Sequence, residues 1–273
     1  MRRARLTLGY DGADFVGSQI QGSGRTVQRE LELAIQRLAP GSGRTSFAGR
    51  TDRGVHAVGQ VVSLNVSWSD SAERLRDALN VVLPPDMSVG AVEWTSPTFH
   101  ARYDATWREY RYRIWVAPTP PPLGRRYVWW RRSELDGAVA SDACSTLLGR
   151  HAFGTFAGSG RSRSHDAAAL TRTVRTCEWR VQTSGAVVRH ELRIEADGFL
   201  PQMVRTIVAT IVLVAQGKRD VQWFREALRA NDRSVPGEPA PPEGLFLWCV
   251  RYDDERDDSG DGFRSDWEYG IEP

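Results

Sequence analysis

The sequence predicts an α+β fold of two pseudo-symmetric halves, each a mostly antiparallel sheet with helices on one face. Two patterns predict it. Alternating apolar and polar residues mark short strands, and apolar residues that recur every three or four positions mark the helices between them. Strands and helices follow in a similar order in each half, which favours layers of helix on sheet. We expect the active site in a cleft between the halves, because such interfaces are common ligand sites.

The first half is predicted to span residues 1–104. In its opening strand the apolar residues Ala4, Leu6 and Leu8 alternate with polar neighbours. Thr26 is placed as a helix N-cap, where its hydroxyl can accept a backbone N–H. In chain order, the expected elements are a strand at 3–10, a helix after Thr26, strands at 45–48 and 58–66, a helix opened by Asp70 or Ser71, and a strand at 88–94.

The second half is predicted to span residues 105–252. A strongly alternating strand opens it, and Ser184 and Gly185 are placed at the turn of a hairpin. A long apolar helix is expected to end at Gly217, and Asp220 to cap the helix that follows. In chain order, the expected elements are a strand at 106–116, a helix at 134–148, strands at 174–182 and 187–196, helices at 201–216 and 220–230, and a strand at 245–252.

Charge is distributed unevenly along the chain. Residues 253–273 hold nine acidic residues and two arginines, a net charge of −7, and are expected to form a disordered acidic tail. The body, residues 1–252, has a net charge of +9, which favours a polyanionic partner. Lys218 is the only lysine, so the other basic residues are arginines, which grip phosphate through a planar fork. An arginine-biased genome would give the same composition.

The composition and residue spacing argue against a membrane protein, a secreted protein or a metal-binding protein. The most apolar run, Met203 to Ala215, is too short to span a bilayer and contains Arg205, so we expect a buried helix and no membrane association. The three cysteines lie far apart without metal-binding spacing, and the N-terminal residues do not resemble a secretion signal. These observations indicate reduced thiols, a cytoplasmic protein and no metal site.

The loop at residues 49–56 carries the most unusual group of side chains. Asp52 is flanked by Arg50 and Arg53, whose positive charges are expected to lower the pKa of its carboxyl group and keep it ionised. Two bracketing glycines permit a backbone that presents the carboxylate outward. This pattern predicts a catalytic carboxylate, and a surface turn with a local ion pair is the alternative.

Two further residues stand out in the second half. Arg205 interrupts an apolar helix, where its buried charge is unfavourable unless an anion such as Asp52 pairs with it. The alternative is that its side chain reaches solvent at the helix edge. Tyr110 lies on a strand where aromatic residues alternate with arginines, which is typical of a surface on which bases stack. A tyrosine that simply fills the core is the alternative there.

Eight segments in a fixed order carry a resemblance to a known family. They are Tyr10-Asp-Gly-Ala-Asp-Phe-Val-Gly17, Gly49-Arg-Thr-Asp-Arg-Gly-Val-His-Ala57, Phe99-His-Ala-Arg102, Arg108-Glu-Tyr-Arg-Tyr112, His151-Ala-Phe-Gly-Thr-Phe156, Thr171-Arg-Thr173, Phe199-Leu-Pro-Gln-Met-Val-Arg205 and Glu243-Gly-Leu-Phe-Leu247. The chain resembles the TruA family of tRNA pseudouridine synthases from Leu6 to about Tyr252. It departs from the family at Ser18, which usually is tryptophan, and at Arg53, which in bacterial members often is alanine.

The resemblance implies an isomerase that converts uridine to pseudouridine in the anticodon stem-loop of tRNA, at positions 38–40, without metal or cofactor. It implies that Asp52 is the catalytic carboxylate, that Arg205 pairs with it, and that Tyr110 stacks on the flipped uracil. It also implies a homodimer that grips tRNA. The residues that it implies for substrate and RNA binding are Arg50, Arg53, His56, Arg172, Gly244 and Leu245.

Two other functions fit parts of the pattern. A non-catalytic RNA-binding module would use the same basic strands and aromatic residues, but a carboxylate such as Asp52 would repel the phosphates of bound RNA. A carboxylate-dependent hydrolase of sugars usually needs a second carboxylate as acid, and no second candidate stands out near Asp52 in the sequence. Asp52 therefore favours the synthase over both.

Overall fold

The computed structural model describes residues 1–158 and 167–252. The acidic tail expected at residues 253–273 lies outside the described residues. Contacts within the chain divide it into two compact units. Unit 1 contains residues 1–108 and 246–252, and unit 2 contains the described part of residues 109–245. The chain therefore returns to unit 1 for its last described strand.

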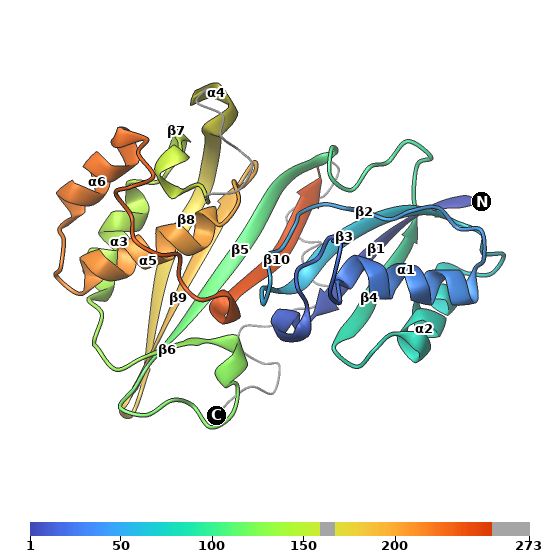
Figure 1. Ribbon diagram of the computed structural model, residues 1–273, viewed down its shortest axis with the longest axis horizontal. Coiled ribbons are helices and arrows are strands. Elements are labelled where there is room, and N and C mark those ends of the chain that lie inside the picture. The colour runs from blue at the N-terminus through green and yellow to red at the C-terminus, as the bar shows by residue number, and fades with distance from the viewer. Residues whose placement is uncertain (159–166, 253–273) are drawn as a thin grey trace. The chain divides into compact units, whose positions relative to one another are not determined.

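Unit 1 is a mixed sheet with two helices (Figure 1). Its strands follow the order β4-β1-β3-β10, and β2 also pairs with β3. The pairings are antiparallel except that of β10 with β3, where Phe246 lies opposite His56. Its elements are β1 (Arg2–Tyr10), η1 (Gly12–Asp14), α1 (Val27–Leu38), β2 (Ser46–Phe47), β3 (His56–Val66), α2 (Ala72–Val82), β4 (Met87–Trp94) and β10 (Leu245–Tyr252).

The sequence pattern of unit 1 explains its elements. Alternate residues of β1 are buried from Ala4 to Tyr10, as the period-two pattern predicts. Helix α1 begins after Thr26, whose hydroxyl accepts the backbone N–H of Arg29 at 3.3 Å. Its apolar stripe, which includes Leu31 and Ile35, is buried. The N-caps and the strand positions predicted for this part of the chain are confirmed to within a few residues.

Unit 2 combines the five strands β5 to β9 with three larger helices (Figure 1). Its strands follow the order β5-β9-β8-β7, and β6 pairs in parallel with β5. Helices α3, α5 and α6 contact one another, and α3 also contacts β8. Its elements are β5 (Ala105–Val116), η2 (Arg125–Tyr127), β6 (Trp129–Arg131), α3 (Gly137–Ser145), β7 (Gly149–Ala152), η3 (Gly154–Phe156), α4 (Ala167–Leu170), β8 (Thr171–Ser184), β9 (Val187–Ala196), α5 (Met203–Ala215), α6 (Val221–Ala230) and η4 (Pro242–Gly244).

The predicted α+β class is confirmed, and the main differences in unit 2 are local. The helix expected at 134–148 is shorter, because Asp136 caps it by accepting the N–H groups of Ala138 and Val139. The strands β6 and β7 were not predicted. They span three and four residues, too few for an alternation of apolar and polar residues to be recognised. No helix in the described part of the chain is long and apolar enough to cross a membrane.

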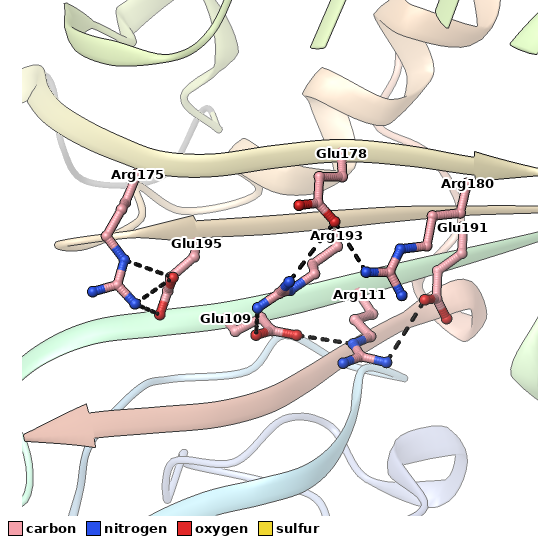
Figure 2. Close-up of polar contacts among 8 residues, drawn as sticks. All are labelled: Glu109, Arg111, Arg175, Glu178, Arg180, Glu191, Arg193 and Glu195. Atoms are coloured by element: carbon pink, nitrogen blue, oxygen red, sulfur yellow. Dashed lines mark hydrogen bonds and ion pairs between the residues drawn. The ribbon is translucent and has the colours of Figure 1, made fainter. Parts of the chain in front are cut away.

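One face of β5, β8 and β9 carries alternating arginines and glutamates, which we call the charged face (Figure 2). At its centre, Glu109 is only 1% exposed and accepts hydrogen bonds from Arg111 Nε at 2.8 Å and Arg193 Nη2 at 3.1 Å. Arg175 and Glu195 form a second pair at 2.9 Å. Because side chains alternate along a strand, Tyr110 and its alternate neighbours on β5 point to the opposite face. The charged face consists of Glu109, Arg111, Arg175, Glu178, Arg180, Glu191, Arg193 and Glu195.

Candidate active site

Asp52 lies in the loop between β2 and β3, and its neighbour Thr51 anchors that loop. Thr51 is buried, and its hydroxyl oxygen lies 2.8 Å from the Tyr10 hydroxyl oxygen. Its backbone N–H donates to Ser18 Oγ at 2.9 Å. At the start of the loop, Gln60 Nε2 donates to the Gly49 carbonyl at 2.8 Å. The backbone on the N-terminal side of Asp52 is therefore fixed by side chains from three other segments of unit 1.

Ser18 both donates a hydrogen bond to the loop that carries Asp52 and accepts one from it. Its backbone N–H donates to the Thr51 carbonyl at 3.0 Å while its hydroxyl accepts the Thr51 N–H. The side chain is 1% exposed. Gly17, which precedes it, has a φ of +130° and a Cβ there would lie 3.1 Å from the Thr51 carbonyl oxygen. The residue that departs from the family pattern thus holds the loop by hydrogen bonds in this chain.

His56 fixes the other end of the loop. It is 1% exposed, stacks on Phe246 with ring centroids 4.9 Å apart, and accepts the Gly12 N–H at Nδ1 at 3.0 Å. Asp11 Oδ1 lies 3.1 Å from the same ring nitrogen. A Cβ on Gly12 would lie 1.9 Å from the Val55 carbonyl oxygen, so only glycine permits this close approach. His56, predicted as an RNA contact, lies buried behind the loop.

The charged side chains of the loop differ in exposure. Arg50 and Arg53 are exposed, whereas Asp52 is half-buried. Behind the loop, burial raises the pKa of Tyr10 to about 12, against the opposing effect of hydrogen bonds with Thr51 and Gln60, so its phenol stays protonated. A carboxylate on so constrained a loop can act as a nucleophile or a base with little reorganisation.

In unit 2, Arg205 holds the segment that ends in Gly244. Its Nε donates to the Ala240 carbonyl at 2.6 Å, and its own carbonyl accepts the Ala240 N–H at 3.0 Å. Helix α5 therefore grips this segment through both the side chain and the backbone of one residue. The predicted residues Gly244 and Leu245 follow four and five residues after Ala240, which Arg205 contacts.

Tyr112 supports the same segment from β5. Its hydroxyl donates to the Pro241 carbonyl at 2.8 Å. Burial raises the pKa of Tyr112 well above its ordinary value, Glu243 adds to the shift, and Arg205 and Arg131 oppose it. A Cβ on Gly244 would lie 2.8 Å from ring carbons of Tyr112. The sequence pattern does not predict Tyr112 as a site residue. Its position on the same strand face as Tyr110 is the feature of the sequence that could have indicated it.

Tyr110 and Arg172 lie along the N-terminal approach to α5. Tyr110 is 7% exposed, and its ring meets Phe199 edge to face with centroids 4.9 Å apart. Arg172, at the start of β8, donates from Nη1 to the Thr171 carbonyl at 2.6 Å. A Cβ on Gly198 would lie 3.2 Å from Arg172 Nε. Tyr110 and Arg172 therefore lie beside neighbouring residues of one short segment, Phe199 and Gly198.

The predicted site residues are divided between the two units. Arg50, Asp52, Arg53 and His56 belong to unit 1, and Tyr110, Arg172, Arg205, Gly244 and Leu245 belong to unit 2. Among residues 1–158 and 167–252, no group of three or more histidine, cysteine, aspartate or glutamate side chains is arranged to hold a metal ion.

Comparison with known proteins gives one consistent result. Residues 8–104 and 143–253 match a family model described as tRNA pseudouridine synthase. A tRNA pseudouridine synthase A of Geobacillus kaustophilus is 39% identical over 255 residues, which cover 93% of this chain and 96% of that protein. The protein of the same name from Chloroflexus aurantiacus is 41% identical, covering 92% of this chain and 89% of its own length. That from Thermus thermophilus is 40% identical, covering 94% and 99%.

Proposed function

Because this chain belongs to the TruA family of tRNA pseudouridine synthases, which are isomerases, we propose that it converts uridine to pseudouridine in the anticodon stem-loop of tRNA, at positions 38–40. The observation that carries the proposal is the fixed loop that presents Asp52, since this loop contains the most specific of the family-like segments. The enzyme acts in the cytoplasm on tRNA as its polyanionic partner, which the net charge of +9 on residues 1–252 supports.

The reaction exchanges one bond of the uridine for another. The bond between N1 and C1′ breaks, the uracil turns, and C5 bonds to C1′. The C5 proton is lost and N1 gains a proton, so the product is an isomer and no electrons are exchanged with an outside partner. Asp52 supplies the carboxylate that attacks C1′ or removes a ribose proton to form a glycal. Neither route requires a metal or a redox cofactor.

Residues of unit 2 complete the proposed site. The Arg205 guanidinium pairs with the Asp52 carboxylate and keeps it ionised and aimed. Tyr110 stacks on the flipped uracil and accepts the C5 proton late in the reaction. Gly244 and Leu245 line the edge of the uracil, and the contacts of Ala240 with Arg205 support this placement.

The RNA contacts proposed for the loop follow from exposure. Arg50 and Arg53 are exposed beside Asp52 and bind phosphates while the target base is outside the stem. Arg172 binds the RNA from unit 2. His56 acts indirectly, because its buried ring supports the loop. Two copies of the chain form a homodimer that grips the tRNA.

Chemical sequencing of unmodified tRNA transcripts after incubation with the protein tests the proposed function. Pseudouridine is expected at positions 38–40, before and after exhaustive dialysis of the protein against EDTA, with Mg²⁺ then restored to fold the tRNA. A transcript with cytidine at these three positions is the matched control. Binding of tRNA without any pseudouridine would instead favour the RNA-binding module.

Arg205 variants test its proposed pairing with Asp52. Arg205→Met should keep the apolar volume of the helix but lower turnover by orders of magnitude. Arg205→Lys should rescue turnover only partly, because a point charge does not reproduce the planar fork. Turnover by Arg205→Met equal to that of the wild-type protein would remove this residue from the mechanism.

A further inference from the structure

Strand β6 presents a tryptophan and an arginine beside Tyr112. The Arg131 guanidinium carbon lies 4.5 Å from the centroid of the Trp129 ring. The Trp129 ring in turn meets Tyr112 edge to face at 6.2 Å. Trp129 and Arg131 therefore lie on the strand face that carries Tyr112, the residue that supports the Pro241–Gly244 segment of the proposed uracil site.

The positive charge of Arg131 is not balanced within the described part of the chain. Its Nε is buried without a hydrogen-bond partner there, and its guanidinium group stacks on the Trp129 ring. Burial lowers the pKa of Arg131, against the opposing effect of Tyr112. Residues 117–133 around it contain four arginines and no acidic residue, so no acid of the same segment can pair with it. A half-buried guanidinium in this state favours an anion from outside the described residues, 1–158 and 167–252.

The position of Arg131 is fixed from the other face of the strand. Its backbone carbonyl accepts the Ala117 N–H at 3.0 Å, and the Trp130 indole N–H donates to the Ala117 carbonyl at 3.0 Å. Trp130 also packs against the buried cluster of Trp115, Ala117 and Val128. With β6 held in this way, little backbone order has to be gained when Arg131 binds a ligand.

We propose that Trp129 and Arg131 form an additional substrate contact, in which the guanidinium stacked on the indole ring binds a backbone phosphate of the tRNA next to the target uridine. The inference rests on the proposed function. The planar guanidinium offers paired N–H donors to phosphate oxygens, and the indole ring orients them. Because the contact is with a phosphate, it adds affinity and position and reads no base.

The test compares Arg131→Gln with Arg132→Gln. Arg132 is exposed and lies over the Trp130 ring at 5.4 Å, so it supplies an equal charge next in sequence but on the other face. The dissociation constant is measured at several salt concentrations with tRNA that has been pre-incubated with wild-type protein, so that no reaction occurs during binding. Arg131→Gln should weaken binding by about tenfold, as loss of one charge-assisted hydrogen bond implies. The slope of log affinity against log salt should fall by about 1.

The control variants sharpen the result. Arg132→Gln should change both quantities much less, and Arg131→Lys should keep the salt slope while it loses part of the affinity. Should Arg131→Gln fail to fold by circular dichroism, Arg131→Lys and Trp129→Leu decide the question, since both must weaken tRNA binding. Unchanged affinity in Arg131→Gln, or an equal loss in Arg132→Gln, would overturn the inference.

Two further measurements separate this inference from its alternatives. Inorganic phosphate that raises the melting temperature of the wild-type protein but not of Arg131→Gln, with equal tRNA affinity in both, would assign the site to a free anion and overturn the proposal. Pseudouridine formation by the wild-type protein is followed in parallel. If it is absent, the proposed function fails, whereas the comparison of Arg131 with Arg132 still decides whether this surface binds RNA.

Discussion

The Tyr112 hydroxyl donates a hydrogen bond to the Pro241 carbonyl across 129 residues of sequence, at 2.8 Å. The adjacent Ala240 is held by Arg205 through two hydrogen bonds. A strand and a helix of unit 2 therefore fix the same short segment, which leads directly into Gly244 and Leu245. The conformation of the segment that leads to the proposed uracil edge therefore depends on its hydrogen bonds with Tyr112 and Arg205.

Tyr112→Phe removes only the hydroxyl that supports Pro241. We expect a loss of about 1 kcal/mol in the free energy of unfolding, because the Pro241 carbonyl loses its buried donor. Turnover should fall more than tRNA affinity, since the segment is displaced near the reacting base. Chemical denaturation and steady-state kinetics measure the two effects. Tyr103→Phe is the control, because Tyr103 is 76% exposed and should tolerate the change.

Gly244→Ala should impair activity through steric overlap. The new methyl group would lie 2.8 Å from both the Arg113 carbonyl oxygen and the Tyr112 ring, so the segment must shift. We expect lower kcat with a fold that circular dichroism shows to be intact. Gly237→Ala provides the matched control, because its added Cβ meets no atom within 4 Å. Equal activity of Gly244→Ala and the wild-type protein would show that this close approach is unimportant.

Glu109→Gln should destabilise the charged face strongly. The substitution leaves Arg111 and Arg193 without the negative charge that both contact at the centre of the cluster. Removing one partner of a buried ion pair costs about 3–5 kcal/mol. Glu178→Gln changes a side chain that is 45% exposed and should cost no more than about 1 kcal/mol. Urea denaturation compares the two, and a smaller loss for Glu109→Gln than for Glu178→Gln would contradict the assignment.

His190 should make the stability of unit 2 sensitive to mild acid. Burial lowers the pKa of His190, and its Nδ1 accepts the Trp179 indole N–H at 3.0 Å. The unfolded chain therefore binds the proton more readily than the folded chain. Stability is full above the ordinary histidine pKa of about 6.5 and decreases as the pH falls from there towards the lower folded-state pKa. As the pH is lowered through this range, the melting temperature of the wild-type protein should fall. That of His190→Gln should fall less, because its amide cannot titrate.

Strong periodic patterns and caps could be predicted from the sequence, whereas long-range pairings could not. The period-two burial of β1 and the caps at Thr26 and Asp220 depend on neighbouring residues, so local sequence was sufficient. The parallel pairing of β10 with β3 joins residues near 246 to residues near 56, and no local pattern encodes it. For the same reason the contact between Tyr112 and Pro241 could not be predicted from the sequence.

The site shows the same division. Asp52 was singled out by its charged neighbours, but its anchoring through Thr51 depends on Tyr10 and Ser18, which are distant in sequence. No local pattern marks Arg131, because it lies in a three-residue strand after a proline-rich segment. Its significance comes from the partner that it stacks on and the acids that its segment lacks.

Turnover by Asp52 variants tests the central claim most directly. Formation of pseudouridine removes the hydrogen from C5, so release of tritium from tRNA labelled at C5 of its uridines follows each turnover. Asp52→Asn and Asp52→Ala should release none above a control without enzyme, while they bind tRNA with near-normal affinity and melt like the wild-type protein. Measurable tritium release by folded Asp52→Ala would contradict the account, because catalysis would then proceed without the carboxylate.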